Sequence, residues 1–308
     1  MKQLTITFVA TLAIAIHTAP VNADILNVIK VEENTYAIVG PLEQRNPENL
    51  GNNATFGLVV TDAGAVLMDP GGSFKGAEAL HGVIKGITDQ PVKYVIDTGG
   101  QDHRWLGNGY WQQQGAQVIA SDDAVADHHD RGSMQLTGLT ALIGADMLVG
   151  TEPAYADITF ANDYTLTLGN VTLELHHEGA AHTPGDSTVW LADRSVLFAG
   201  DIIYMERILG IGSQSNALEW VASFEALAAL APTHIVPGHG APTDLAGATR
   251  DTYDYLINIR TKIADYIDNG GDIIESVKVD QSAFTYLENF GQLAGRNAQE
   301  VYSQMEWE

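Results

Sequence analysis

The feature that most restricts the fold of this chain is a repeated order of short apolar strands, tight turns and helical patterns. In the first half, the segments 25–40 and 55–72 each indicate a hairpin, the second with its turn at 62–64. A helical pattern over 73–87 follows, and then a buried strand over 92–100 that ends in glycines. The first half therefore passes from hairpins into strand–helix units.

The second half repeats this order. Hairpins with turns at 168–170 and 192–194 precede a helical pattern over 217–230, and a short strand within 233–240 ends in a Pro-Gly-rich loop. The remainder of the chain has helical periodicity and no strand pattern. Two halves built in this way, followed by helices, predict an α+β protein with a four-layer αββα sandwich and a C-terminal helical extension.

The first residues are typical of a bacterial secretory signal. Lys2 precedes an apolar stretch over 4–16, and Val21 and Ala23 supply small residues before a cleavage point at Asp24. The stretch is short for a membrane span, and an uncleaved anchor is the alternative. We therefore expect cleavage after Ala23, export to the periplasm or beyond, and no membrane contact afterwards. The expected parts are a signal peptide (1–23), the αββα domain (24–245) and the helical extension (246–308).

Charge and cysteine content exclude several classes of partner and site. The chain has 39 acidic and 15 basic residues, which gives a formal net charge of −24. Nucleic acid and anionic lipid surfaces would repel such a chain, so we expect a small-molecule partner instead. The chain has no Cys, so any metal site must use His, Asp, Glu or the backbone. Nothing in the sequence predicts an oligomeric state.

Three glycine-rich segments place His or Asp side chains where strands are expected to end. In chain order they are "HTPGDS", "LFAGD" and "VPGHG", and they carry His182, Asp201 and His239. Glycine lets the backbone bend tightly there, so the neighbouring side chain is presented in the open. One such His alone is more often structural, but three segments on strand ends indicate a functional site.

The segment "AHTPGDSTVWLADRSVLFAGD" followed by "VPGHG" resembles the metallo-β-lactamase superfamily of αββα hydrolases, and the resemblance covers roughly residues 30–245. In that family the residue matching His182 binds a first zinc ion. The residue matching Asp201 bridges two zinc ions, and the residue matching His239 binds the second. The resemblance thus implies a zinc-dependent hydrolase that acts on a small molecule.

The family's fourth motif, His-x-His-x-Asp-His, is degenerate in this chain. An alignment of "DTGGQDHRWLGN" (97–108) without gaps matches the family at both flanks. The residues at the usual ligand positions are then Gly99, Gln101, His103 and Arg104. A gapped alternative keeps Asp102 and His103 as the family's Asp-His pair. Without gaps, the first zinc position retains only one imidazole, from His182.

The first functional hypothesis is a hydrolase with one metal ion, zinc or iron, on His103, Asp201 and His239, aided by His182. Two imidazoles and one carboxylate suffice for a catalytic zinc with an open water position. Such an ion would activate water to cleave an ester, lactone, amide or sulfur-ester bond. Asp102 would act as an orienting residue or general base.

Arg104 supports a second hypothesis. A guanidinium is permanently charged and cannot bind a metal, but it can form a forked pair with Asp201 and replace the missing cation. The chain would then be a metal-free pseudoenzyme that binds a small anionic ligand. A third possibility is that Arg104 binds an anionic substrate group beside one metal ion. Contact between Arg104 and Asp201 favours the metal-free hypothesis, and an Arg104 turned away from three converging donors favours the hydrolase.

Other polar and aromatic residues near the motif have simpler interpretations. The run "DHHD" at 127–130 lies in a helical pattern, where neighbours point in different directions. We therefore expect a solvated surface, with replacement of a lost metal ligand by one of these histidines as the alternative. The aromatic residues expected to pack in the core are Trp105, Tyr110 and Trp111.

Overall fold

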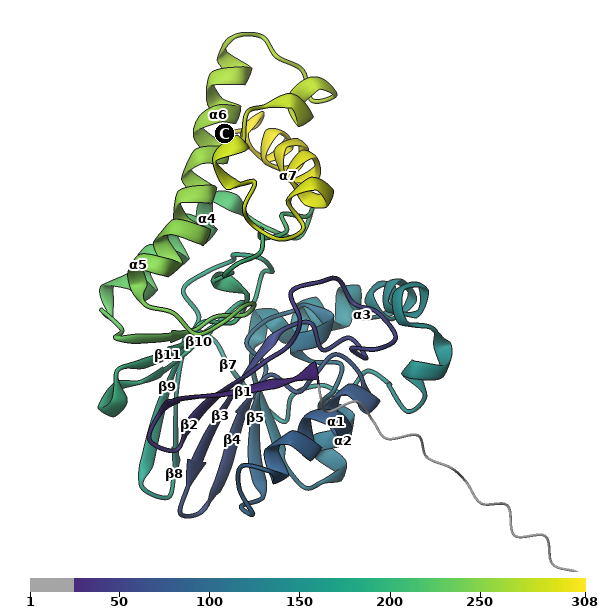
Figure 1. Cartoon of the computed structure of the whole chain (residues 1–308), viewed down its shortest axis with the longest axis vertical. Helices are drawn as coiled ribbons and strands as arrows, with labels where there is room; N and C mark the ends of the chain where they lie inside the picture. Colours follow the sequence, from purple (N-terminus) through teal and green to yellow (C-terminus); the bar gives the residue numbers. More distant parts are fainter. Residues whose placement is uncertain (1–24) are drawn as a thin grey trace, which may run out of the picture.

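The structure, a computed structural model, describes residues 25–308 and consists of two β-sheets packed face to face with helices on both outer sides (Figure 1). The expected signal peptide and its cleavage point lie outside the described residues. Within 25–308, no helix combines the length and apolar character that a membrane crossing requires.

The larger sheet has seven strands that follow one another in sequence order. They are β1 (Asn27–Glu32), β2 (Thr35–Val39), β3 (Thr55–Thr61), β4 (Gly64–Met68), β5 (Val92–Ile96), β6 (Gln117–Ser121) and β7 (Ile158–Phe160). The pairing is antiparallel from β1 to β4 and parallel from β4 to β7. The predicted turn at 62–64 joins β3 to β4, and Thr61 Oγ1 closes it by donating to the carbonyl of Gly64.

The smaller sheet has five strands in the order β12-β11-β10-β9-β8. They are β8 (Asp163–Leu168), β9 (Val171–His176), β10 (Thr188–Leu191), β11 (Val196–Phe198) and β12 (His234–Val236). The two hairpins, β8 with β9 and β10 with β11, turn where the sequence predicted them, and β12 adds in parallel to β11.

Helices cover both sheets, and side-chain caps fix where several of them begin. They are α1 (Phe74–Lys85), α2 (Asn108–Gln113), α3 (Asp122–Ile143), α4 (Ala217–Ala229), α5 (Leu245–Ala248), α6 (Asp254–Asp268) and α7 (Phe290–Met305). Ser73 caps α1 by accepting from the amide of Gly76, and Ser121 caps α3 by accepting from that of Ala124. The sequence did not predict α2 or the short strand β7.

Three apolar clusters divide the molecule into four layers. One cluster lies between the sheets and includes Met68 and Phe198. A second joins the larger sheet to α1 and α2, and a third joins the smaller sheet to α4, α6 and α7. The αββα fold predicted from the sequence, with C-terminal helices, is thereby confirmed. Trp105, Tyr110 and Trp111 are buried, as expected of core aromatic residues.

The prediction that 127–130 forms a solvated surface is wrong for two of the four residues. Asp127 and His128 are buried, because α3 lies directly over the loop that carries the degenerate motif. The His128 ring stacks on Trp105 with centroids 4.4 Å apart, and its Nε2 lies 3.1 Å from the carbonyl of Gly99. Burial lowers the pKa of His128 to about 4. His129 and Asp130 are exposed.

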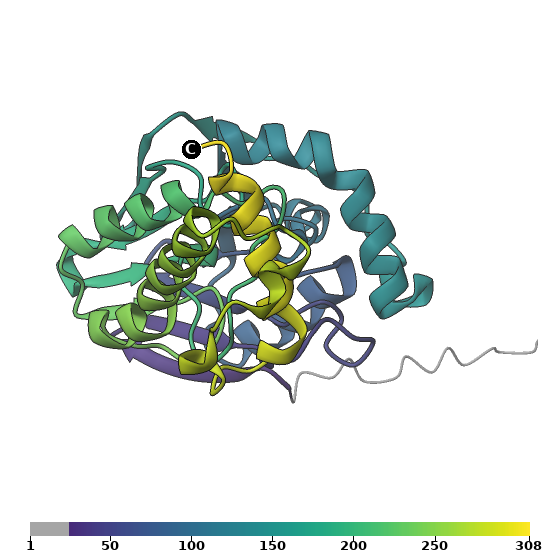
Figure 2. The ribbon, with the colours of Figure 1, turned by 90° about the horizontal axis from the view of Figure 1, so that it is seen from above.

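The C-terminal helices extend the sandwich at one end. In Figure 2, α6 and α7 lie across the centre of the view, and the long α3 runs along one edge of the molecule. Both α3 and α7 contribute side chains to a cavity that the predicted site residues His103, His182 and His239 also line.

Candidate functional site

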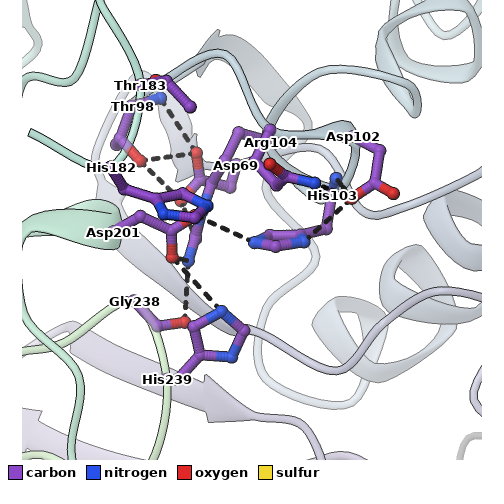
Figure 3. Close-up of polar contacts among 12 residues, drawn as sticks. Asp69, Thr98, Asp102, His103, Arg104, His182, Thr183, Asp201, Gly238 and His239 are labelled. Carbon is purple, nitrogen blue, oxygen red and sulfur yellow. Dashed lines mark hydrogen bonds and ion pairs between the residues drawn. The ribbon is translucent and has the colours of Figure 1, made fainter. Parts of the chain in front are cut away.

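The predicted site residues lie on loops that follow strands of both sheets (Figure 3). Asp69 follows β4, and the loop of 97–104 follows β5. Asp201 follows β11, His239 follows β12, and His182 belongs to the loop between β9 and β10. Parallel neighbours end at the same edge of a sheet, so the fold brings these distant segments together.

The centre of the site is the guanidinium group of Arg104, which is fully buried. Its Nη1 donates to Asp69 Oδ2 at 2.6 Å and to the carbonyl of Thr55 at 3.3 Å. Its Nη2 donates to Asp201 Oδ1 at 2.7 Å and to the carbonyl of Gly238 at 2.7 Å. Four oxygen atoms from both sheets therefore surround one positive charge, as ligands surround a cation.

Local backbone features hold this arrangement in place. Asp69 adopts a left-handed conformation with φ of 68°, which is unusual for a residue other than glycine. The amide and hydroxyl groups of Thr98 each donate to Asp69 Oδ1 at 2.9 Å. A Cβ atom at Gly238 would lie 2.6 Å from Nη2 of Arg104, so only glycine admits the guanidinium here.

The two carboxylates that bind Arg104 differ in their electrostatics. Burial alone would raise the pKa of Asp201, but Arg104 and then His103 hold that pKa well below its usual value. Burial is the largest influence on Asp69 and raises its pKa despite the contact with Arg104. Asp201 is therefore the main counter-charge of the guanidinium.

Three of the four predicted metal ligands converge on one point. His103, Asp201 and His239 are buried and offer ligand atoms that all lie within 4.8 Å of one another. Nε2 of His103 is 3.1 Å from Asp201 Oδ2, and Nε2 of His239 is 3.2 Å from Asp201 Oδ1. His182 is outside this group. Its Nδ1 donates to the carbonyl of Gly210 at 2.8 Å, and burial lowers its pKa to about 4.

Asp102 is already engaged and is poorly suited to accept a proton. Its Oδ1 accepts from Nε and Nη2 of Arg45 at 2.9 and 2.6 Å and lies 3.1 Å from Nδ1 of His103. Burial would raise the pKa of Asp102, but Arg45 holds it below the usual value. The carboxylate therefore orients Arg45 and His103, as the orienting role predicted for it would require.

Carboxyl groups fill the space beside Gly99 and Gly100, where side chains of the family's motif would begin. A Cβ atom at Gly99 would lie 2.2 Å from Oδ1 of Asp186, and one at Gly100 would lie 1.8 Å from Oδ2 of Asp127. The carboxyl group of Asp186 is bonded to the amide and hydroxyl groups of Thr183. Burial raises the pKa of Asp186 to about 8, so its carboxyl group is mostly neutral at pH 7.

These residues do not fit a two-zinc centre. The first position retains the imidazole of His182 but has Gly99 and Gln101 at the other ligand positions, whereas zinc sites use three or four His, Cys, Asp or Glu side chains. The second position has two imidazoles and a carboxylate, which are suitable donors for one ion. There, however, the guanidinium of Arg104 shares the only carboxylate.

A cavity of about 330 Å³ is lined in part by residues of this cluster. His103, His182, Tyr204 and His239 line its floor. Four of the chain's 15 basic residues also line it, and all four are arginines. They are Arg45, Arg131, Arg207 and Arg296. Sequence reasoning missed this set, because its members lie far apart in the chain and belong to no motif.

Comparison with known proteins gives one family and many solved structures. The Metallo-beta-lactamase superfamily matches residues 51–239. A metallo-beta-lactamase from Pontibacter korlensis is 23% identical with a TM-score of 0.61, over 76% of this chain and 99% of that one. The metallo-beta-lactamases DIM-1 and TMB-1 are 20% and 17% identical, with TM-scores of 0.55 and 0.57. Each match spans 74% of this chain and 95% of the other. At these identities the structures establish the fold alone.

The close approach of the Asp186 carboxyl group to Gly99 predicts that a larger residue at this position will destabilise the fold. We expect Gly99→Ala to lower the free energy of unfolding by about 1–3 kcal/mol, because the added methyl group displaces the buried carboxyl group of Asp186. The matched control is Gly82→Ala on α1, where nothing lies within 4 Å of the new atom. This control should be neutral or stabilising by up to about 1 kcal/mol. Urea unfolding measures both, and equal effects would contradict the prediction.

The raised pKa of Asp186 predicts a pH-dependent stability. The folded state keeps this carboxyl group protonated up to about pH 8, whereas the unfolded chain releases the proton near 3.8. The folded state thus binds more protons between these values, and the unfolding free energy falls as the pH rises through them. Asp186→Asn should flatten this slope, while the exposed control Asp89→Asn should keep it. An unchanged slope in Asp186→Asn would contradict the assignment.

Proposed function

This chain belongs to the metallo-beta-lactamase superfamily, and we propose that it is a metal-free member that binds a small organic anion. Members of the superfamily are generally metal-dependent hydrolases, so the function of this chain depends on what occupies the metal position. The observation that carries this proposal is the guanidinium of Arg104 between Asp69 and Asp201.

Magnitudes favour the guanidinium over a metal ion at this position. A divalent ion about 4 Å from a guanidinium would be repelled by about 8 kcal/mol at an effective dielectric constant near 20. Zinc binding in structural sites contributes about 10–16 kcal/mol, so the repulsion would remove most of that affinity. Arg104 cannot lose its charge to relieve it, because the two carboxylates raise its already high pKa. Displacing Arg104 would remove the guanidinium that compensates the buried carboxylates of Asp69 and Asp201.

Loss of the metal removes the family's means of hydrolysis. A bound ion supplies activated water, and the chain offers no obvious substitute within the site. Asp102 is bonded to Arg45, and burial keeps the pKa values of His182 and His239 low. The arginines that line the cavity instead support binding of an anion. The protein would be exported through its N-terminal signal and would bind its ligand outside the cytoplasm.

One observation favours a second candidate, a hydrolase with a single metal ion. Nδ1 of His239 donates to the carbonyl of Asn53 at 2.7 Å, so Nε2 of the neutral ring carries a lone pair. That lone pair faces Oδ1 of Asp201 at 3.2 Å, and two acceptors facing each other suit a cation. His103, Asp201 and His239 would hold the ion, which would supply activated water for cleavage of an ester, lactone, amide or sulfur-ester bond.

Metal content separates the two candidates. We expect the mature protein, purified from zinc-replete cells and dialysed, to contain zinc at background levels by plasma mass spectrometry. Arg104→His should bind about one equivalent, because it removes the cation and adds an imidazole.

The matched control for this experiment is Arg104→Met, which removes the charge without adding a ligand and should bind zinc more weakly than Arg104→His. One equivalent of zinc or iron in the wild-type protein, lost in His239→Ala, would establish the single-metal candidate and refute the metal-free proposal.

A further inference from the structure

Arg207 is a buried cation without an anionic partner. Its side chain lines the cavity, and the residue is only 4% exposed. Within residues 25–308 its guanidinium has one polar contact, between Nη1 and Nδ1 of His239 at 3.3 Å, and its Nε has no hydrogen-bond partner. Nδ1 of His239 already donates to Asn53, so Arg207 faces another N–H group there. A buried charge left in this state is costly unless a ligand supplies the acceptor.

Arg296 is a second arginine without a carboxylate partner in the described chain. It lies on α7 and is exposed at the rim of the same cavity. A Cβ atom at Gly210 would lie 3.1 Å from Nη2 of Arg296. The guanidinium therefore lies next to the loop of Gly210, whose carbonyl accepts a hydrogen bond from His182. No ion pair joins it to the acids of residues 25–308.

The other two arginines of the cavity are already neutralised. Arg45 pairs with Asp102 at 2.6 Å, and Arg131 pairs with Asp127. The two oxygens of Asp201 are engaged by Arg104 and His103. Four guanidinium groups with two carboxylate partners leave two positive charges open to a ligand.

The cavity also has an apolar wall. Met134 and Leu142 on α3 are 65% and 48% exposed, which is high for large apolar side chains. With Leu139 and Leu293 they line the same cavity as the arginines. An inorganic anion would leave this wall in water, whereas an organic ligand would cover it. The volume of about 330 Å³ is at the small end of the range for ligand pockets.

We propose that the ligand is a small organic diacid whose carboxylates bind Arg207 and Arg296 and whose apolar body lies against Met134, Leu139 and Leu142. This inference rests on the anion-binding function proposed above and adds the number of charges and the apolar character of the ligand. It also gives the C-terminal extension a role, because Arg296 lies outside the matched family region of 51–239.

Titration calorimetry with a homologous series tests the diacid. The probes are straight-chain dicarboxylates from malonate to suberate and monocarboxylates of equal length, in low-salt buffer near neutral pH. We expect an optimum at one dicarboxylate length, with an affinity at least about tenfold above that of the matched monocarboxylate. Arg296→Gln should reduce this preference to near unity, because only the outer contact is lost.

Arg207→Gln and Arg207→Lys should weaken binding of both series, and thermal unfolding will report whether each variant is folded. Arg250→Gln, an exposed arginine outside the cavity, should bind as the wild type does. Equal affinity for diacids and monoacids, or a preference that survives Arg296→Gln, overturns the diacid inference while anion binding stands. Absence of binding by every probe overturns both the inference and the proposed function.

Discussion

The buried contact of Arg104 with Asp69 and Asp201 is the interaction on which the rest of the site depends. It joins the end of β4 in the larger sheet to the end of β11 in the smaller one, and carbonyl groups of Thr55 and Gly238 complete it. Breaking such a pair leaves buried charges uncompensated and typically costs about 3–5 kcal/mol. Loss of either partner would therefore destabilise the sandwich at the place where the family places its metal.

The residues around Arg104 fit the proposed change from metal binding to anion binding better than they fit unrelated losses of single metal ligands. The carboxyl group of Asp186 fills the space next to Gly99, and Arg45 engages Asp102. The chain carries a formal charge of −24, yet four arginines line the cavity over the site. A positive cavity on a strongly negative protein attracts small anions to one place. The metal-free function proposed above would therefore keep a binding cavity without the hydrolytic chemistry of the family.

Local patterns predicted the fold because they act over short distances. The turns at 62–64 and 192–194 and the glycine-rich strand ends indicated both sheets, and the resemblance to the family implied the convergence of Asp201 with His239. Burial of His128 was not predictable, because a helical pattern does not reveal which face a neighbouring loop covers. Arg207 and Arg296 come together only through tertiary packing, so no sequence spacing could indicate their shared cavity.

The most direct test of the account is zinc-edge anomalous diffraction from crystals of the mature protein grown with excess zinc. The account predicts Arg104 nitrogens about 3 Å from both carboxylates and no anomalous peak between His103, Asp201 and His239. A peak at that point, with the guanidinium displaced from Asp201, would contradict the claim that Arg104 has taken the place of the metal.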